Sequence, residues 1–444
     1  MFIKIAQLFL SLTILVTLHE FGHFWFAKRF KCRVDKFYLF FDFLFPFANI
    51  MNFALIKKKI GDTEYGLGWF PFGGYVQIAG MVDEQMDKSL IEKPAEPWEL
   101  RSKPAWQRLL VMMGGIIVNF VLGIIIFWMC FFVWGKTSVP VTNLPHGLAI
   151  DSSAYEMGLR NGDYITSLDK KPVTDVKRIP LEIIMNGVST IEGVHADGTK
   201  FSLPVNDNDR AKILRRIKKS HLVEPRVTSI IGYIDSTAFA ANADLKIDDK
   251  IIAVNGKKVR YHDEAKAQWL ANKGKIVNIT LLRGTDTITT KCQVSDLGIL
   301  GYGNKPNADK IKIEEHKFGI GAAFVEGVKD GMEQIVMQAK QFVVIFTVKD
   351  AHKKVGGFYT MVQQMNAEWD WQSFWMFTGF LSLALAFMNF LPIPMLDGGY
   401  IMFILWEMIT GKKVSDKVIY YANNVGLFLV LGLMVWANTD WLRD

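Results

Sequence analysis

The stretch that decides the fold class is residues 5–26, which read IAQLFLSLTILVTLHEFGHFWF. No charged residue precedes His19-Glu20 within it, and apolar side chains continue beyond His23. A helix needs about 20 predominantly apolar residues to cross a bilayer, so this stretch is long enough only if the three ionisable residues lie inside the span. Lys4 is the only charge before it and no small-residue cleavage pattern follows, so we expect a membrane helix rather than a cleaved signal peptide.

Three further uncharged runs reach the same length, namely Leu109–Gly135, Trp371–Leu396 and Val418–Thr439. The sequence therefore predicts a polytopic α-helical membrane protein with four transmembrane helices. Half of the residues are hydrophobic and 21% are charged, a composition that excludes a disordered chain. The mean hydropathy of +0.17 averages these apolar spans with a polar region between the second and the third.

Basic residues gather beside the span ends at residues 28–36, 101–108 and 412–417. The positive-inside rule places all three groups in the cytoplasm, so both termini and residues 136–370 are expected on the extracytoplasmic side. This distribution accounts for much of the formal charge of +7. We therefore expect lipid headgroups, and no nucleic acid, as the partners of the basic patches.

The polar region contains an internal repeat. Residues 154–173 read AYEMGLRNGDYITSLDKKPV and residues 240–259 read AANADLKIDDKIIAVNGKKV, with Ala, Leu, Asp, Ile and Val at matching positions. Each copy predicts a short helix, a turn, a strand and a hairpin, and is similar to the bacterial PDZ domain; in the second copy Asp248 replaces the usual glycine. We expect two extracytoplasmic α+β PDZ-like domains, which either bind peptides at a sheet edge or act as steric filters.

The ionisable turn of the first span, His19-Glu20-Phe21-Gly22-His23, is an HExxH motif. Residues four apart share one face of a helix, so both imidazoles can reach one metal ion and Glu20 can address the water on it. Ionisable groups inside an apolar span are costly and mark functional sites by default. The alternative is an interfacial polar cluster at the end of the helix. Gly22 leaves room beside the metal for another backbone.

A further metal ligand is predicted in the run NFLPIPMLDGG at residues 389–399. Asp397 is the only charge in the third span, and Pro392 and Pro394 interrupt the helix so that this carboxylate can turn inward. Taken alone, the prolines are also typical of a kink and Asp397-Gly398 of a turn. Together with the two histidines they predict one Zn²⁺ per chain, with Asp397 as the third protein ligand.

HExxH in the first span, NxxPxPxLDG in the third and PDZ-like modules between the second and third together resemble the site-2 protease family, in its RseP-type bacterial branch. The resemblance implies an intramembrane zinc endopeptidase of the bacterial cytoplasmic (inner) membrane. Its expected substrates are transmembrane segments of single-span proteins, such as anti-sigma factors trimmed outside the membrane, or remnant signal peptides. Residue by residue, it makes His19, His23 and Asp397 zinc ligands, Glu20 the general base and Asn389 a substrate-binding residue. The alternative for Asn389 is an interhelical hydrogen bond.

The run EYGLGWFPFGGYV at residues 64–76 looks like the membrane-associated β-hairpin of this family, which we expect over about residues 62–80. A free strand edge there would pair with an unwound substrate segment, whereas the alternative is a plain amphipathic hairpin. The expected substrate-binding residues are Asn389, Gly73, Gly74, Pro392 and Pro394.

The expected segments, in order, are the first transmembrane helix with HExxH (1–28), a cytoplasmic or membrane-associated region with the hairpin (29–107), the second transmembrane helix (108–135), the first PDZ-like domain (136–220), the second PDZ-like domain (221–308), an extracytoplasmic helical connector (309–370), the third transmembrane segment with a broken helix and the LDG motif (371–410) and the fourth transmembrane helix (417–439). Two features depart from the family. Residues 41–60 form a longer and more apolar stretch, and residues 355–358 lack the proline of the usual Gly-Pro pair.

Two other classes of function compete with proteolysis. A membrane scaffold would use the PDZ-like modules to bind extracytoplasmic tails, and an ion or zinc transporter would use His19, Glu20 and Asp397 as a transport site. A glutamate directly beside the first histidine favours hydrolysis, because transport needs no positioned base. The PDZ-like modules are expected to contact substrate ectodomains or other extracytoplasmic proteins. Cys32, Cys130 and Cys292 are too few and too far apart for a disulfide framework.

Overall fold

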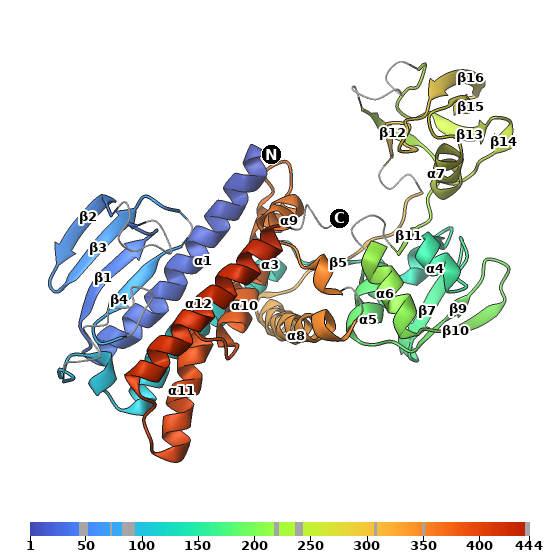
Figure 1. Ribbon diagram of the computed structural model, residues 1–444. Coiled ribbons are helices and arrows are strands. Elements are labelled where there is room, and N and C mark those ends of the chain that lie inside the picture. Colours follow the sequence, from blue (N-terminus) through green and yellow to red (C-terminus); the bar gives the residue numbers. More distant parts are fainter. Residues whose placement is uncertain are drawn as a thin grey trace. The chain divides into compact units, whose positions relative to one another are not determined.

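The computed structural model (Figure 1) describes residues 1–43, 52–71, 73–81, 94–216, 222–235, 243–305, 309–348 and 351–439. The chain divides into two compact units. One unit comprises Met1–Gly135, Lys317–Ile345 and His352–Asp444, and the other comprises Lys136–His316 and Phe346–Ala351.

Four helices of the first unit are long and apolar enough to cross a membrane among the described residues, which confirms that prediction. These are α1 (Phe2–Arg29), α3 (Ala105–Val133), α10 (Trp371–Phe390) and α12 (Asp416–Asn438). The unit also contains α9 (Phe358–Gln364), α11 (Asp397–Thr410) and most of α8 (Ile320–Thr347). The helical path is broken over residues 391–396, between α10 and α11.

The central helix of the first unit is α3, which contacts α1, α10 and α11. α1 and α3 meet backbone to backbone, since a Cβ atom at Gly22 would lie only 2.3 Å from the carbonyl oxygen of Gly114. On the other side of α3, the hydroxyl of Ser382 in α10 donates a hydrogen bond of 2.7 Å to the carbonyl oxygen of Asn119. Small residues thus bring the turn with HExxH close to α3.

A four-stranded sheet in the order β2-β3-β1-β4 follows α1. Its strands are β1 (Val34–Leu39), β2 (Ala54–Ile60), β3 (Thr63–Gly68) and β4 (Tyr75–Ile78). The hairpin expected over about residues 62–80 is therefore wrong in its pairing, because β3 and β4 both pair with β1. Two glycines allow the neighbouring segments to approach β1 closely. A Cβ atom at Gly66 would lie 2.3 Å from the Tyr38 ring, and one at Gly74 would lie 2.7 Å from the Tyr38 carbonyl oxygen.

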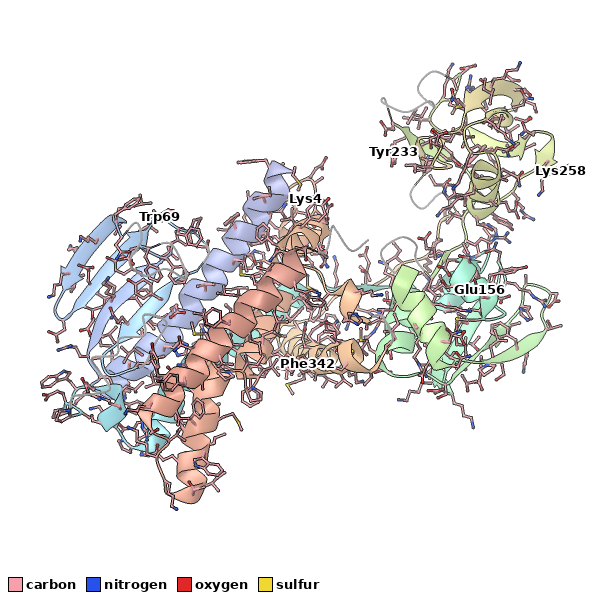
Figure 2. All side chains as sticks on the ribbon, in the orientation of Figure 1. Lys4, Trp69, Glu156, Tyr233, Lys258 and Phe342 are labelled. Atoms are coloured by element: carbon pink, nitrogen blue, oxygen red, sulfur yellow. The ribbon has the colours of Figure 1, made fainter. Side chains whose placement is uncertain are left out.

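The two departures from the family lie in this unit. Of the apolar stretch 41–60, residues 44–51 lie outside the described residues. In the described part, the Phe53 ring stacks on Trp69 with centroids 5.6 Å apart. Figure 2 shows Trp69 beside the sheet. At the second departure, a Cβ atom on Gly357 would lie 2.6 Å from the carbonyl oxygen of Ala437, so this loop packs closely on α12 without a proline.

The sequence repeat forms two modules with equivalent sheets in the second unit. The strand order is β10-β9-β7-β8 in one module and β16-β15-β13-β14 in the other. All four strands correspond in sequence order, and in both modules a helix follows the short hairpin. The two sheets comprise β7 (Tyr164–Leu168), β8 (Lys171–Pro172), β9 (Thr190–Val194), β10 (Lys200–Pro204), β13 (Lys250–Val254), β14 (Lys257–Lys258), β15 (Ile276–Arg283) and β16 (Asp286–Gln293). The PDZ-like identity of the modules stays a prediction.

Shorter pairs complete the second unit: β6 with β11, β12 with β17, and β5 with β18. The remaining elements are β5 (Lys136–Ser138), β6 (Leu148–Ile150), β11 (Val223–Pro225), β12 (Ile231–Ile234), β17 (Tyr302–Asn304), β18 (Glu314–His316), α4 (Ser152–Glu156), α5 (Ile179–Met185), α6 (Asp207–Arg216) and α7 (His262–Ala271). The β5–β18 pair joins the beginning and the end of the unit's main segment.

The three cysteines are free and buried.

The repeated aspartate shapes the same turn in both modules. Asp163 accepts a hydrogen bond of 2.8 Å from the backbone N–H of Arg160, and Asp249 accepts one of 2.8 Å from that of Lys246. Asp248 has a φ of +73°, in the left-handed region that favours glycine. This explains why the first copy has glycine at the matching position. The first alanine of the second copy, at position 240, lies outside the described residues.

Candidate metal centre

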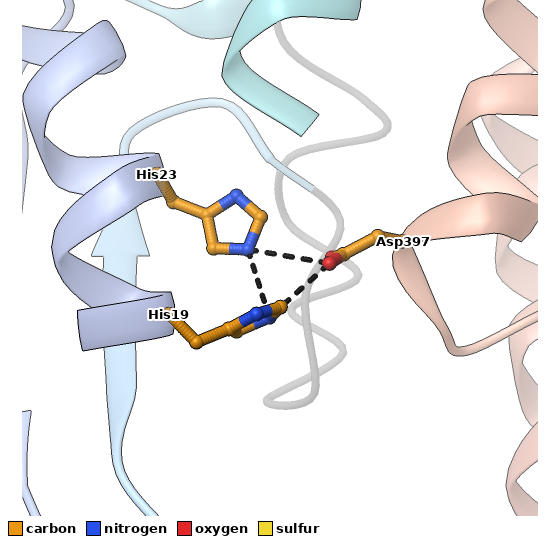
Figure 3. A group of neighbouring side chains, drawn as sticks. All are labelled: His19, His23 and Asp397. Carbon is orange, nitrogen blue, oxygen red and sulfur yellow. Dashed lines mark hydrogen bonds and ion pairs between the residues drawn. The ribbon is translucent and has the colours of Figure 1, made fainter. Parts of the chain in front are cut away.

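Three side chains from two distant segments converge between α1 and the start of α11 (Figure 3). His19 and His23 lie one turn apart on α1, and their Nε2 atoms are 3.2 Å from each other. Oδ2 of Asp397 lies 3.2 Å from Nε2 of His19 and 3.4 Å from Nε2 of His23. The residues that the sequence predicts as ligands therefore form a nearly equilateral triangle of donor atoms.

The spacing of these atoms fits a zinc ion. Ligand atoms at about 2.0–2.1 Å from a tetrahedral zinc lie roughly 3.3 Å from one another, close to the three observed separations. Oδ2 of Asp397 is buried and accepts no hydrogen bond from any described residue. A buried carboxylate oxygen without a donor is costly, so a cation among these three atoms would satisfy it. Two imidazoles and one carboxylate are also an ordinary ligand set for catalytic zinc.

The backbone of α3 fixes the ring of His23. Nδ1 of His23 lies 2.8 Å from the carbonyl oxygen of Val111, which can only accept, so Nδ1 carries the proton and donates it. The other ring nitrogen, Nε2, therefore keeps its lone pair and points at His19 and Asp397. This outer contact sets both the tautomer and the orientation that metal binding requires.

His19 is flanked by two amides. Asn119 of α3 lies 3.2 Å from Nδ1 of His19, and Asn389 of α10 lies 3.3 Å from its Nε2. Oδ1 of Asn119 is buried and has no partner among the described residues. Exchanging the oxygen and nitrogen of this amide would let the oxygen accept the Nδ1 proton of His19 and would free Nε2 for a metal. Asn119 is thus a candidate outer partner of His19.

Gly115 makes space for both imidazoles. A Cβ atom at this position would lie 2.5 Å from Nε2 of His23 and 2.5 Å from Cε1 of His19. Any side chain larger than hydrogen would therefore occupy the volume of the ligand rings. The two adjacent glycines of α3 have different neighbours: Gly114 lies against the backbone of α1, and Gly115 lies against the two histidine rings.

The three candidate ligands line a cavity of about 550 Å³. Its described lining includes Glu20, Asn119, Asn389, Asn423 and the edge strand β4 with the preceding Gly73 and Gly74. The volume is in the range of sites that take small ligands or a stretch of peptide. Apolar side chains form most of the wall.

Tyr75 of β4, in the cavity wall, makes a hydrogen bond and an aromatic stacking contact. The hydroxyl of Tyr75 donates to Oδ1 of Asp42 at 2.8 Å, and the ring stacks on Tyr38 of β1 with centroids 5.4 Å apart. Burial and this hydrogen bond raise the pKa of Tyr75, so the hydroxyl stays protonated as a donor. The strand that borders the metal centre is therefore rigidly attached to the rest of its sheet.

Most predicted site residues meet in this cavity, but two do not. His19, Glu20, His23, Asn389 and Asp397 line it together with Gly73 and Gly74. Pro392 and Pro394 lie in the break between α10 and α11, and they are not among the described residues that line this cavity. Their contact with substrate stays a prediction. The contact of Asn389 with His19 on α1 is interhelical, so a structural role and a substrate role for this amide are compatible.

Sequence reasoning missed the groups that orient the ligands. The Val111 carbonyl carries no sequence signal, and the position of Asn119 beside His19 depends on how α3 packs on α1. A signal for Gly115 was present in the Gly114-Gly115 pair, but choosing which glycine faces the histidines requires the rotation of α3 relative to α1.

The family model described as Peptidase family M50 matches residues 7–433, which is nearly the whole chain. The chain belongs to peptidase family M50. The resemblance to site-2 proteases and the prediction of a hydrolase are thereby confirmed.

Curated relatives align with this M50 peptidase over almost their full length. The regulator of sigma-E protease RseP of Escherichia coli is 25% identical, with 97% of this chain and 96% of the relative covered. Protease RseP of Yersinia pestis is 23% identical over the same shares of both chains. A Xylella fastidiosa protein whose name includes the words zinc metalloprotease is 25% identical, again with 97% and 96% covered. The apolar helices and these relatives together indicate a membrane-embedded peptidase.

Proposed function

We propose that this M50 peptidase is an intramembrane zinc endopeptidase that hydrolyses peptide bonds in transmembrane segments of single-span proteins or in remnant signal peptides, as in regulated intramembrane proteolysis. The observation that carries the proposal is the ligand triangle of His19, His23 and Asp397 beside Glu20, in a cavity among membrane-length helices. A donor set of this kind inside an apolar bundle has little use unless it does chemistry there.

One zinc ion would be bound by Nε2 of His19, Nε2 of His23 and a carboxylate oxygen of Asp397. Zinc, when bound, supplies a Lewis acid that activates water and polarises a carbonyl group. Glu20 lies on the same turn as the histidines and lines the same cavity, so its carboxylate can take a proton from the attacking water and pass it to the departing amine. The Asn389 amide, next to His19, would donate to the substrate backbone.

The edge strand β4 would bind the substrate in an extended form. A helical substrate hides its amides in its own hydrogen bonds, so the segment must unwind before hydrolysis. β4 lies at the end of its sheet with one edge free of other described strands, and Gly73, Gly74 and Val76 border the cavity beside the ligands. Strand addition at this edge would pair the exposed backbone and present the scissile bond to Glu20.

The positive-inside rule supports an orientation in which both termini and the two repeated modules lie outside the cytoplasm. We propose that the modules exclude substrates with bulky ectodomains, so that only trimmed proteins reach the cavity. Deletion of residues 147–295 should then permit cleavage of an intact substrate. Unchanged selectivity of the deletion variant would count against the filter and favour peptide binding by the modules.

Metal analysis and a cleavage assay together test the proposed function. The wild type, Glu20→Gln, His23→Ala and Asp397→Asn are purified, their zinc content is measured, and each is incubated with a model single-span substrate. We expect one zinc per chain in the wild type and in Glu20→Gln, loss of zinc in the two ligand variants, and cleavage by the wild type alone. Equal zinc in all four proteins overturns the metal site, and full activity of Glu20→Gln overturns the mechanism. Metal-dependent flux in proteoliposomes would instead identify a transporter.

A further inference from the structure

The loop that carries the third ligand contains a strained residue. Met395 lies two positions before Asp397 and has a φ of +81°, in the left-handed region that side-chain-bearing residues rarely adopt. Such a conformation persists only when surrounding contacts impose it. The loop between α10 and α11 therefore needs a partner that keeps Met395, and with it Asp397, in place.

The side chain of Asn423 in α12 provides contacts on both sides of Asp397. Its Oδ1 atom accepts a hydrogen bond of 3.4 Å from the backbone N–H of Met395, and its Nδ2 atom donates one of 2.6 Å to the hydroxyl of Tyr400. Tyr400 lies in the first turn of α11, three residues after Asp397. Asn423 is 1% exposed, so these bonds do not compete with bulk water.

A second contact of α12 lies one turn further on and faces the same loop. A Cβ atom at Gly426 would lie 2.2 Å from the carbonyl oxygen of Pro394, so the backbone of α12 touches the strained segment directly. The opposite face of the helix is exposed, with 68% of Tyr421 and 73% of Phe428 accessible. Asn423 and Gly426 thus form the side of α12 that meets the loop.

We propose that Asn423 is a positioning residue for the metal centre, because its two hydrogen bonds clamp the segment from Met395 to Tyr400 and so orient the carboxylate of Asp397. This inference rests on the proposed zinc site. It gives the fourth span a role in metal affinity, although no ligand lies on it.

A neighbouring asparagine offers a matched control. Asn424 has the same side chain on the same helix, but its Nδ2 atom donates at 2.8 Å to the carbonyl oxygen of Tyr420, one turn earlier in α12. Asn423→Leu and Asn424→Leu are prepared as full-length proteins, and their dissociation constants for Zn²⁺ are measured by competition with a chromophoric chelator. We expect Zn²⁺ affinity to fall about tenfold in Asn423→Leu, as when an outer partner of a ligand is removed, and to change less than about twofold in Asn424→Leu.

A rescue variant separates positioning from general destabilisation. Glycine adopts a positive φ at little cost, so Met395→Gly should restore most of the Zn²⁺ affinity when it is combined with Asn423→Leu. Equal affinity in Asn423→Leu and the wild type, or equal losses in the two asparagine variants, overturns the inference. A wild type that binds no Zn²⁺ overturns the proposed function itself. If Asn423→Leu does not fold, Asn423→Ala replaces it in the same comparison.

Discussion

Replacing Gly115 with alanine adds one methyl group at the point where α3 meets both histidines. The new Cβ atom would lie 2.5 Å from Nε2 of His23 and from Cε1 of His19, whereas ordinary contacts begin near 3.4 Å. The rings must therefore retreat by about 0.9 Å. Zinc–ligand distances vary by only about 0.2 Å, so a retreat of this size takes at least one nitrogen out of reach. We expect Zn²⁺ affinity to fall by at least about 100-fold and cleavage to be lost.

The assay compares Gly115→Ala with Gly123→Ala, which lies two turns further along α3. At Gly123 the nearest atoms to a new Cβ belong to the Leu383 side chain, at 2.6 Å, followed by the Gly379 carbonyl oxygen at 3.3 Å, and none of them belongs to a proposed ligand. Zinc content after dialysis, cleavage of a model substrate and the melting temperature are measured for both variants. Gly123→Ala should keep its zinc even if it melts earlier. Stoichiometric zinc and wild-type cleavage in Gly115→Ala would refute the reasoning.

Three further predictions concern the outer partner of His19 and the repeated turn. Asn119→Leu should weaken Zn²⁺ affinity about tenfold, measured by chelator competition, because Nδ1 of His19 loses its amide neighbour. Burial opposes the charge of Asp249, but hydrogen bonds from Arg283 and the Lys246 N–H outweigh it and lower its pKa. The stability from this carboxylate is therefore present above its unfolded pKa of about 3.9 and is lost as the pH falls through the lower folded-state pKa. Asp249→Asn should remove this acid dependence and destabilise the module by about 1.5 kcal/mol, seen as faster hydrogen exchange in β13 and β15. Asp248→Gly should stabilise the same module by about 1 kcal/mol, measured as slower hydrogen exchange in β13 and β15, because glycine adopts a positive φ without the steric cost of a side chain.

The sequence predicts those parts of the molecule in which chemistry and local pattern coincide. The apolar runs identify the four membrane-length helices, since a span needs only length and apolarity. The convergence of His19 and His23 is predictable because a spacing of four places them on one face of a helix. The involvement of Asp397 is predictable because a single charged residue in an apolar span is energetically costly and therefore indicates a functional site. The turn residues that recur in the two sequence copies also predict the two modules of the second unit.

The features that escape prediction depend on how segments are inserted and rotated. β1 separates β3 from β4, and nothing in residues 62–80 shows that another strand will pass between them. The backbone carbonyl of Val111 has the same chemistry at every position of α3, so only the packing of α1 selects it for His23. Asn423 and Asn424 are indistinguishable in sequence, and the rotation of α12 decides which of them meets the loop.

Each proposed ligand is oriented by a helix other than its own, and this has a consequence for assembly. α3 orients His23 through Val111 and His19 through Asn119, α10 adds Asn389 beside His19, and α12 contacts the loop before Asp397. A fragment with α1 and α3 would place the two histidines but lack the carboxylate, and a fragment without α12 would leave the strained loop unsupported. High-affinity Zn²⁺ binding at the proposed site would therefore require that all four spans have assembled, and an incompletely assembled chain would lack a competent hydrolytic centre.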